Sequence, residues 1–555
     1  MTTLDDTAND TADDTANDTV SSTTRAPGPT TARPSWASDE RVAEWTGWVF
    51  RDPAGTATST ATSPYDGQPT APVPLSSTDD VADAIRSARA AQVTWALLPW
   101  STRAAIVLRF HDLLVERQDE VIDLIQWEMG KARFSAWQEI LQVATIARHY
   151  ARHGRHYLGD NKVRGAMPGL TKVREVRVPK GVIGMISPWN YPLYLAVGDV
   201  LPALLAGNGV VSKADSQTPL TLLWTRALMA EAGLPRNLWH VVVGPGSVVG
   251  DALIGSPDGG VGVDHICFTG STATGRHVGR RAGERLIAAS LELGGKNPMI
   301  VRADADVAKA AAGCVAAAFA NTGQMCIHIE RVIVHDEVYD AFRTALVAAT
   351  EALRVGQAFD YSVDVGSLAS PAQLEAVTSH VASAVAAGAT VLAGGRARPD
   401  LGPLVHEPTV LEGVTPEMPV CLEETFGPVI SLYRVQSDQE ALDRANEGRY
   451  GLSASIWSRD TAAAEDMAGS VRAGSVNVND GAAAAAGSIE AGMGGMGDSG
   501  LGRRHGAEGI RKYTESQTVA TQRLVPLGPP AGMALDRFVG IGNAQLRLLR
   551  RLRVR

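Results

Sequence analysis

The stretch that decides the fold is Val182-Ile183-Gly184-Met185-Ile186, a short apolar run followed at once by Ser187-Pro188-Trp189-Asn190-Tyr191-Pro192. Three further apolar runs follow, at 210–212, 238–243 and 265–268, and helical patterns separate them. Buried strands that alternate with helices are typical of a parallel, doubly wound α/β sheet. Such sheets bind ligands at the carboxyl ends of their strands, so we expect a site in the loops that follow these runs.

On either side of this sheet the sequence predicts further elements. A Ser/Thr cap at Ser77 begins one long helix, and two more are centred on 106–114 and 137–146. Alternating apolar and charged residues from 171 to 178 predict a strand with one solvent-exposed face. Beyond Cys326 a second α/β pattern predicts another domain, with strands at 330–335, 390–392, 429–433, 453–457 and 475–479.

The composition is that of a globular protein. A chain of 555 residues has room for about two to four domains, and its net charge of −9 argues against a nucleic-acid partner. Four cysteines without CxxC or metal-ligand spacing make neither a disulfide framework nor a metal site, which favours a reducing cytoplasm. We expect no secretory signal and no membrane span. Residues 1–37, rich in Thr, Ala, Asp and Asn and then in Pro, are predicted to be disordered.

A carboxylate and a thiol stand 34 positions apart, each among Gly and Asn. They lie in Glu292-Leu293-Gly294-Gly295-Lys296-Asn297-Pro298 and in Asn321-Thr322-Gly323-Gln324-Met325-Cys326. A cysteine in such a loop can act as a thiolate nucleophile, and a carboxylate can deprotonate the water that releases a covalent intermediate. Taken alone, a cysteine followed by the apolar Ile327 is more often a buried small hydrophobe.

Two loops that follow predicted strands have the composition of ligand sites. Gly270-Ser271-Thr272-Ala273-Thr274-Gly275 leads into a helix whose free amides suit a dinucleotide phosphate, with an ordinary turn as the alternative. In the loop 188–192, two prolines fix the backbone around Asn190, whose amide can donate to a developing oxyanion; a rigid aromatic turn is the alternative. The loop 244–250 contains a proline, which removes an amide, so we interpret it as a strand-to-helix turn.

Together these motifs resemble the aldehyde dehydrogenase superfamily over about residues 45–523. They stand in the family's order: PWNYP at 188–192, Lys213 with QTP at 217–219, GSTATG at 270–275, ELGGKNP at 292–298, GQMC at 323–326, EETFGP at 423–428, Asn446 with YGL at 450–452, and SG at 499–500 running to YTE at 513–515. Within the family the chain is similar to an actinobacterial branch labelled NADP-dependent succinate-semialdehyde dehydrogenase.

The resemblance implies a covalent mechanism. The Cys326 thiolate attacks the aldehyde carbon, the Asn190 amide and the Cys326 N–H steady the oxyanion, and hydride passes to a nicotinamide. Glu292 then activates the water that hydrolyses the thioester, so the expected product is the free acid.

The resemblance also implies a cofactor cleft lined in part by Lys296. The expected cofactor-binding residues are Ile186, Pro188, Trp189, Lys213, Ser216, Gly246, Gly270, Ser271, Gly275, Leu293, Glu424 and Phe426. Lys213 and Glu424 are expected at ribose hydroxyls and Phe426 on the nicotinamide. In NAD-preferring relatives a glutamate stands three residues after the lysine, where this chain has Ser216. A hydroxyl there can donate to a 2′-phosphate, so the expected cofactor is NADP, with NAD as the alternative.

Three parts follow from the resemblance. They are a Rossmann-type dinucleotide-binding domain at 38–157 and 179–293, an α/β catalytic domain at 294–505, and a small β oligomerisation flap at 158–178 and 506–523. A homodimer or homotetramer is expected. The final segment, 524–555, interleaves Leu and Arg as a basic amphipathic helix does. It could lie on an anionic membrane surface, but glycines at 540 and 542 favour packing on the protein's own body or on an oligomer partner.

The aldehyde substrate is left open between two classes. The branch label indicates succinate semialdehyde. Better-understood enzymes of that label hold the substrate carboxylate with two arginines, at positions where this chain has Gly198 and Ala320. A charged substrate would need another partner, such as His328 or an arginine from a distant loop, and the alternative is an uncharged aliphatic or aromatic aldehyde. The segment 493–500 also lacks the family's lysine, which we expect to reshape the substrate funnel.

Overall fold

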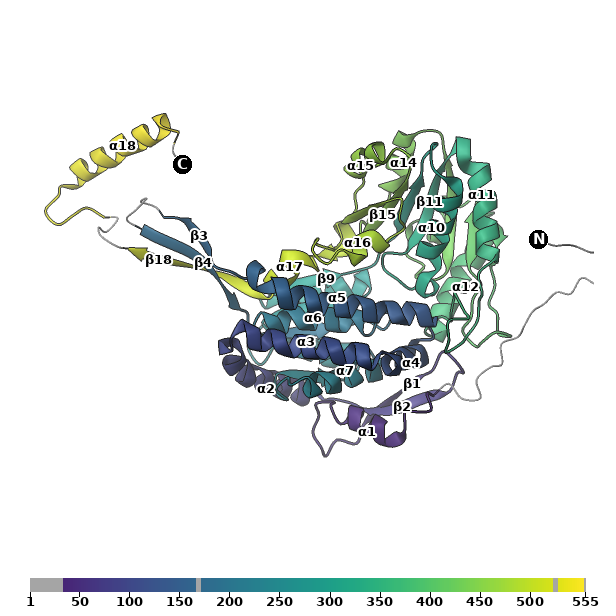
Figure 1. Cartoon of the computed structure of the whole chain (residues 1–555), viewed down its shortest axis with the longest axis horizontal. Helices are drawn as coiled ribbons and strands as arrows, with labels where there is room; N and C mark the ends of the chain where they lie inside the picture. The colour runs from purple at the N-terminus through teal and green to yellow at the C-terminus, as the bar shows by residue number, and fades with distance from the viewer. Residues whose placement is uncertain (1–32, 166–170, 523–527, 554–555) are drawn as a thin grey trace, which may run out of the picture.

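The computed structural model describes residues 33–165, 171–522 and 528–553. Two lobes and a projecting arm make up the molecule, as Figure 1 shows. One lobe is built on a six-stranded sheet, the other on a seven-stranded sheet, and the arm on a three-stranded sheet. The α/β fold class predicted from the sequence is confirmed.

The six-stranded sheet has the order β17-β9-β8-β5-β6-β7. Its strands are β5 (Val182–Ile186), β6 (Gly209–Lys213), β7 (Trp239–Val242), β8 (His265–Thr269), β9 (Ala288–Glu292) and β17 (Gly500–Leu501). All pairs are parallel except β17 with β9. The chain runs outward from β5 to β7 and then returns to the other side of β5 for β8, so the topological switch point lies between β5 and β8. All four strands predicted from apolar runs are present.

Nine α-helices belong to the described part of this half of the chain. They are α1 (Asp39–Thr46), α2 (Thr78–Leu97), α3 (Trp100–Glu116), α4 (Gln118–Met129), α5 (Arg133–Tyr157), α6 (Tyr194–Leu205), α7 (Pro219–Glu231), α8 (Asp251–Ile254) and α9 (Thr272–Glu284). The cap predicted for α2 is a full capping box between Ser77 and Asp80. Helix α4 is missing from the prediction, because a single residue, Arg117, separates it from α3 and provides no side-chain cap.

The seven-stranded sheet has the order β12-β13-β14-β11-β10-β15-β16, and only β12 is antiparallel to its neighbour. Its strands are β10 (Asn297–Val301), β11 (Ile329–His335), β12 (Thr390–Ala393), β13 (Thr409–Glu412), β14 (Val429–Val435), β15 (Ser453–Trp457) and β16 (Ser475–Val478). Its helices are α10 (Val307–Phe319), α11 (Asp336–Glu351), α12 (Pro371–Ala386), α13 (Pro419–Leu422), α14 (Asp438–Ala445), α15 (Thr461–Ala468) and α16 (Ala483–Gly487). The five strands predicted beyond Cys326 are confirmed.

The arm joins segments that are far apart in the sequence. Strand β4 (Thr171–Pro179) lies between β3 (Asn161–Arg164) and β18 (Thr514–Gln522), and both pairings are antiparallel. Helix α17 (Gly506–Arg511) leads the chain into β18. The strand predicted at 171–178 is confirmed, whereas the domain boundaries drawn from the resemblance stay a prediction. A further hairpin, β1 (Thr58–Thr62) with β2 (Pro69–Pro74), lies at the edge of the first lobe.

The predicted disordered segment is too long at its carboxyl end. Residues 1–32 lie outside the described residues, but 33–37 belong to the folded body. The indole of Trp36 donates a hydrogen bond to Asp123 at 2.9 Å, and Ala37 is buried. An aromatic side chain with a paired N–H anchors these residues, although the surrounding Pro and Thr composition favours disorder.

The carboxyl-terminal tail forms the helix α18 (Leu535–Arg551) despite its two glycines. None of its residues is buried, and Leu535 and Leu546 are 68% and 66% exposed. In Figure 1 it lies beyond the arm, away from both lobes. The tail therefore does not pack on its own subunit here, and contact with a partner subunit or an anionic membrane surface stays a prediction. No helix among the described residues is long and apolar enough to cross a bilayer.

We expect a partner subunit to cover the apolar face of α18, because contiguous apolar surfaces are seldom left in water. Removing residues 531–555 should reduce the size of the assembly measured by size-exclusion chromatography with light scattering. Intact and shortened chains should behave alike in flotation with anionic liposomes. Flotation of the intact chain alone would contradict this expectation and support membrane contact.

Candidate active site

Cys326 lies in the turn between α10 and β11. The turn begins with η2 (Ala320–Gly323), in which three consecutive residues have left-handed φ values of 52°, 57° and 68°. Side chains other than glycine rarely adopt this backbone, so neighbouring groups must hold it. At Gly323 a Cβ would lie 2.1 Å from the carbonyl oxygen of Gly427, which only glycine avoids. The backbone conformation of the turn that leads into Cys326 is therefore fixed by its surroundings.

The predicted oxyanion residue lies against this turn. Asn190 follows β5, and its Nδ2 donates to the carbonyl oxygen of Gln324 at 3.0 Å, two residues before Cys326. In return, Nδ2 of Asn321 donates to the carbonyl oxygens of Asn190 at 3.1 Å and of Gln324 at 2.9 Å. A side-chain amide has two N–H groups, and the second of Asn190 makes no hydrogen bond to the described residues. The structure thus brings Asn190 and the Cys326 turn together, as predicted.

A buried ion pair fixes the backbone at Asn190. The Nζ of Lys131 donates to Glu139 at 2.8 Å and to the carbonyl oxygen of Asn190 at 2.7 Å, and both charged side chains are fully buried. The other oxygen of Glu139 accepts from the backbone N–H groups of Leu193 and Tyr194, at 3.0 and 2.9 Å. Those amides open α6, so the carboxylate also caps the positive end of that helix.

The thiol of Cys326 is half-buried and protonated at rest. Burial raises its pKa to about 12, and the carboxylates of Glu424 and Glu292 add to the rise. Only the thiolate is nucleophilic, so the proton has to leave when the substrate is attacked.

Glu292, the predicted base for thioester hydrolysis, is buried and partly unpaired. It ends β9, is buried, and one of its carboxyl oxygens has no hydrogen-bond partner among the described residues. Burial raises its pKa to about 7, and the cations of Arg504 and Lys512 oppose the rise. A carboxyl group with a pKa near neutrality is suited to general base catalysis. At Gly494, in the segment without the family's lysine, a Cβ would lie 3.1 Å from the Glu292 carboxylate, so that segment forms its wall.

Lys213 and Ser216 lie at the carboxyl end of β6, on one side of the switch point. Lys213 is buried, yet its ammonium makes no hydrogen bond within the described part of the chain. Burial lowers its pKa, and Asp215 opposes that effect. Ser216 is exposed beside it. A buried ammonium without an acceptor is costly, so this position fits a ligand that offers hydroxyl or phosphate oxygens.

The other side of the switch point is the start of α9. Its cap, Ser271, accepts a hydrogen bond from the Thr274 N–H at 3.3 Å. Gly275 packs on Leu293, because a Cβ there would lie 2.3 Å from that side chain. The free amides of this 13-residue helix suit a phosphate. Among the other predicted residues, Ile186 and Gly270 end or follow neighbouring strands, Pro188 is half-buried, and Gly246 is exposed at the start of a single π-turn, η1 (Gly246–Gly250).

The seven-stranded lobe supplies the facing wall. A carboxyl oxygen of Glu424 accepts from the N–H of Gly295 at 2.9 Å, and a Cβ at Gly294 would lie 2.2 Å from its other oxygen. Phe426 is half-buried, and its ring meets that of Trp189 edge-on at 5.6 Å. Contacts of Glu424 with Gly295 and of Phe426 with Trp189 therefore join the two lobes here, and the set of residues present fits a dinucleotide.

Glu330 gathers two of the residues singled out in the sequence. This buried carboxylate pairs with Lys296 and lies 3.2 Å from His328, and the two contacts lower its pKa although burial opposes them. Lys296 is thus paired with a protein carboxylate, and its place along the cofactor cleft stays a prediction. His328 is fully buried in the same cluster and cannot receive a substrate carboxylate. Glu330 also accepts from the Thr425 N–H at 3.1 Å, which orders the loop that carries Phe426.

A model of the aldehyde dehydrogenase family matches residues 50–519. The chain belongs to the aldehyde dehydrogenase family. It is 48% identical over 485 residues to a Mycobacterium tuberculosis protein provisionally named succinate-semialdehyde dehydrogenase [NADP(+)] 2, covering 87% of this chain and 92% of that protein. A crystal structure of succinate-semialdehyde dehydrogenase from Burkholderia pseudomallei superposes with a TM-score of 0.80 at 34% identity, covering 84% and 95% of the two chains. An NADP-dependent enzyme of E. coli gives 0.80 at 33% identity, covering 84% and 95%.

Two buried ion pairs of this aldehyde dehydrogenase are not predicted from the sequence. One is Lys131 with Glu139, and the other is Asp199 with Arg504. For the first pair a local signal exists: Glu139 stands on the apolar face of a predicted helix, where an unpaired carboxylate would be costly. For the second pair, whose partners are 305 residues apart, the sequence offers no comparable signal.

Lys131→Met should destabilise the aldehyde dehydrogenase by about 3–5 kcal/mol, because it leaves the Glu139 carboxylate buried without its cation. The free energy of unfolding in urea measures the effect. Lys309→Met is the matched control: its side chain is 79% exposed, and we expect a change within about 0.5 kcal/mol. Equal stabilities of the two variants would contradict the structural role of the pair.

Proposed function

We propose that this aldehyde dehydrogenase oxidises its substrate to the free acid by covalent catalysis at Cys326, with Asn190 as oxyanion donor and Glu292 as base. The observation that carries the proposal is the strained turn at 321–323, which leads into Cys326 and is hydrogen-bonded to Asn190 through Asn321 and Gln324. Such strain persists where a function requires it.

In the proposed reaction, Sγ of Cys326 bonds to the aldehyde carbon as the thiol proton passes to solvent water, and the C=O π electrons move to the carbonyl oxygen, which becomes an oxyanion. The free N–H of the Asn190 side chain and the Cys326 backbone N–H stabilise that charge. A bound nicotinamide supplies the hydride acceptor. Once the carbon is a thioester, Glu292 takes a proton from water, the water oxygen bonds to the carbon, and the C–S bond breaks. Aldehyde, water and oxidised cofactor thus give acid, reduced cofactor and one proton.

The proposed cofactor is NADP, with NAD as the alternative. Lys213, Ser216 and the start of α9 would hold the adenosine ribose and the phosphates, and Glu424 the second ribose. Phe426 and Trp189 would flank the nicotinamide. The unpaired ammonium of Lys213 and the exposed hydroxyl of Ser216 both suit a 2′-phosphate, and the M. tuberculosis relative is named for NADP.

The proposed substrate is succinate semialdehyde. The names of the M. tuberculosis and B. pseudomallei relatives support it. The runner-up is an uncharged aliphatic or aromatic aldehyde, supported by Gly198 and Ala320 standing where better-understood relatives have arginines.

We also propose a homodimer or homotetramer assembled through the arm, whose three strands project from the body and offer unpaired edges. The proposed location is the cytoplasm, supported by four cysteines that are all free thiols.

Cys326→Ala should abolish aldehyde oxidation without unfolding the chain, whereas Glu292→Gln should keep a burst of reduced cofactor followed by slow turnover. The reason is that the thiol acts before hydride leaves and the carboxylate acts after it. Stopped-flow absorbance of the reduced nicotinamide separates the phases. Normal turnover by Cys326→Ala would refute the mechanism.

Thioester hydrolysis should accelerate as pH rises through about 7, because the base works only when ionised and burial raises the pKa of Glu292 to about 7. The steady-state rate after the burst, measured between pH 5 and 9, gives the apparent pKa. A midpoint near the ordinary glutamate pKa of about 4.3 would contradict the role assigned to burial.

Succinate semialdehyde should exceed butanal in kcat/KM by about tenfold or more, since a charge-assisted contact is worth on the order of 1.4 kcal/mol at least. Steady-state rates with both aldehydes measure the ratio. Equal values would favour the uncharged class of substrate.

Ser216→Glu should shift cofactor preference toward NAD, because a carboxylate repels a 2′-phosphate and accepts hydrogen bonds from ribose hydroxyls. The ratio of kcat/KM for NADP and NAD is compared in both proteins, with Ser470→Glu, in an exposed turn of the other lobe, as the control. A wild type that prefers NAD tenfold, or an unchanged ratio in Ser216→Glu, would show the cofactor proposal to be wrong.

A further inference from the structure

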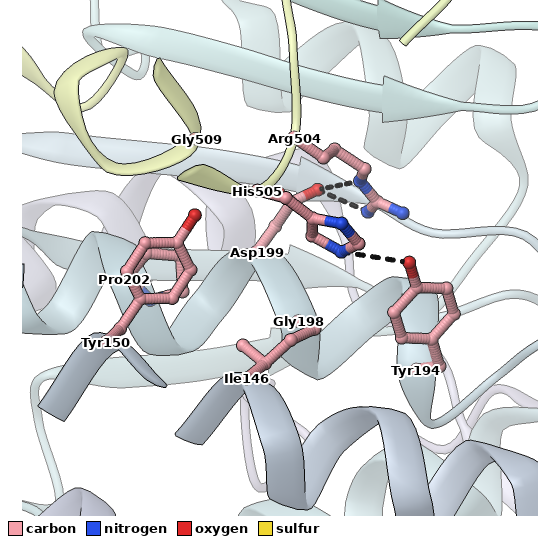
Figure 2. Close-up of a pocket in the computed structure, with 9 residues that line it drawn as sticks. All are labelled: Ile146, Tyr150, Tyr194, Gly198, Asp199, Pro202, Arg504, His505 and Gly509. Carbon is pink, nitrogen blue, oxygen red and sulfur yellow. Dashed lines mark hydrogen bonds and ion pairs between the residues drawn. The ribbon is translucent and has the colours of Figure 1, made fainter. Parts of the chain in front are cut away.

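A pocket beside the candidate active site is lined by Tyr150, Tyr194, Gly198, Arg504 and His505, among others. Figure 2 shows these side chains around the space, with Asp199 behind the Arg504 guanidinium. Helix α6, which begins at the Asn190 loop, supplies one wall, and the segment before α17 supplies the opposite wall. The pocket therefore lies between the helix that follows the Asn190 loop and the segment that carries Arg504.

Arg504 is only 5% exposed, and its hydrogen bonds use only part of the guanidinium. Its Nε donates to Asp199 at 3.0 Å, and its Nη2 donates to Asp199 and, at 2.9 Å, to the carbonyl oxygen of Leu195. Its Nη1 makes no hydrogen bond to the described residues, and in Figure 2 one nitrogen points away from Asp199 without a dashed line. The two N–H donors of Arg504 Nη1 thus have no acceptor among the described residues.

The charges around Arg504 leave a positive excess. Asp199 also accepts from the Lys512 ammonium at 3.1 Å and from the Tyr513 hydroxyl at 2.9 Å, so two cations share one carboxylate. His505, whose pKa burial and Arg504 lower to about 3, adds no charge near neutral pH. Glu292, the other carboxylate in the field of Arg504, is only partly ionised near neutral pH because burial raises its pKa to about 7. The cluster can therefore accept an additional anion.

Backbone contacts connect Arg504 to the surroundings of Cys326. The N–H of Met493 donates to the carbonyl oxygen of Arg504 at 2.8 Å, and Met493 packs on the same hydrophobic cluster as Cys326. The Arg504 cation also lowers the pKa of Cys326 and of Glu292. Tyr194 links the two regions: its ring centroid lies 5.8 Å from the guanidinium carbon, and its hydroxyl lies 3.2 Å from His505 Nε2.

Gly198 lines the same pocket. At this position the better-understood enzymes have one of their two carboxylate-binding arginines, and here the side chain is absent. The nearest atom to a Cβ at Gly198 would be Cδ1 of Ile146, at 3.2 Å, so a side chain there would contact the pocket wall.

We propose that the Arg504 guanidinium binds the carboxylate of the substrate, in place of the arginines missing at Gly198 and Ala320. The substrate class is then a short aldehyde with a carboxylate at its far end. This inference rests on the proposed function, which it deepens by naming the group that selects the substrate. A charge-assisted contact to a planar guanidinium provides both affinity and orientation.

Arg504→Gln should reduce the ratio of kcat/KM for succinate semialdehyde over butanal by about tenfold or more, mainly through KM for the charged aldehyde. Arg503→Gln is the matched control. Arg503 also lowers the pKa of Glu292 but does not line the pocket, so its ratio should stay within about threefold of wild type. Equal losses for both aldehydes in Arg504→Gln would overturn the proposal and assign Arg504 to Glu292 alone.

Two more variants address folding and position. Asp199→Asn combined with Arg504→Gln avoids a buried carboxylate that has lost a partner, and it should show the same fall in the ratio. Adding Gly198→Arg to Arg504→Gln restores a cation in the pocket and should recover the preference for succinate semialdehyde. If the double variant with Asp199→Asn and Arg504→Gln does not lower the ratio of kcat/KM for succinate semialdehyde over butanal, the assignment of Arg504 to the substrate carboxylate is refuted.

A binding measurement separates this inference from the proposed function. Calorimetric titration with succinate and with butyrate needs no turnover, and Arg504→Gln should weaken succinate binding by about tenfold relative to butyrate. A wild type that oxidises neither aldehyde would refute the proposed function, while the titrations would still decide the role of Arg504. Equal succinate affinities in wild type and Arg504→Gln would refute the carboxylate site.

Discussion

The buried ion pair of Lys131 with Glu139 is the interaction on which the candidate active site depends. It connects three separate pieces of chain: the start of α5, the loop that carries Asn190, and the first turn of α6. Each charge is matched by its partner and by backbone groups, as a buried pair requires. Because α6 also carries Asp199, the position of that one helix sets both the oxyanion donor and the charged pocket.

Buried charge is used again in the second lobe, for a different purpose. Glu330 gathers Lys296, His328 and the N–H groups that open the Phe426 loop. Phe426 has a left-handed φ of 53°, a conformation that a bulky residue adopts only when it is held. The hydrogen bonds of Glu330 thus stabilise the loop conformation that places the Phe426 ring. One anion orders each wall of the cleft, Glu139 on the side of Asn190 and Glu330 on the side of Phe426.

Much of the fold could be predicted because its strands are short apolar runs whose pattern is local. The nine strands expected in the two lobes lie where the sequence indicates, and the motif residues gather at the ends of those strands. The partners of buried polar side chains could not be predicted in this way. Lys296 and His328 are polar residues in promising positions, but the sequence cannot show that Glu330, on the neighbouring strand, takes both. Arg504 and Asp199 meet only through tertiary structure, and the left-handed path through Asn321 is held by the distant Asn190 as well as by the nearby Gln324.

The half-buried thiol has a consequence for chemical durability. Burial raises the pKa of Cys326 to about 12, so the thiol is protonated at neutral pH. Peroxides and electrophiles attack thiolates, so a protonated thiol is a poor target for oxidants. In the proposed mechanism the thiolate exists only while substrate is being attacked. The sulfur on which that mechanism depends is therefore chemically inert between turnovers.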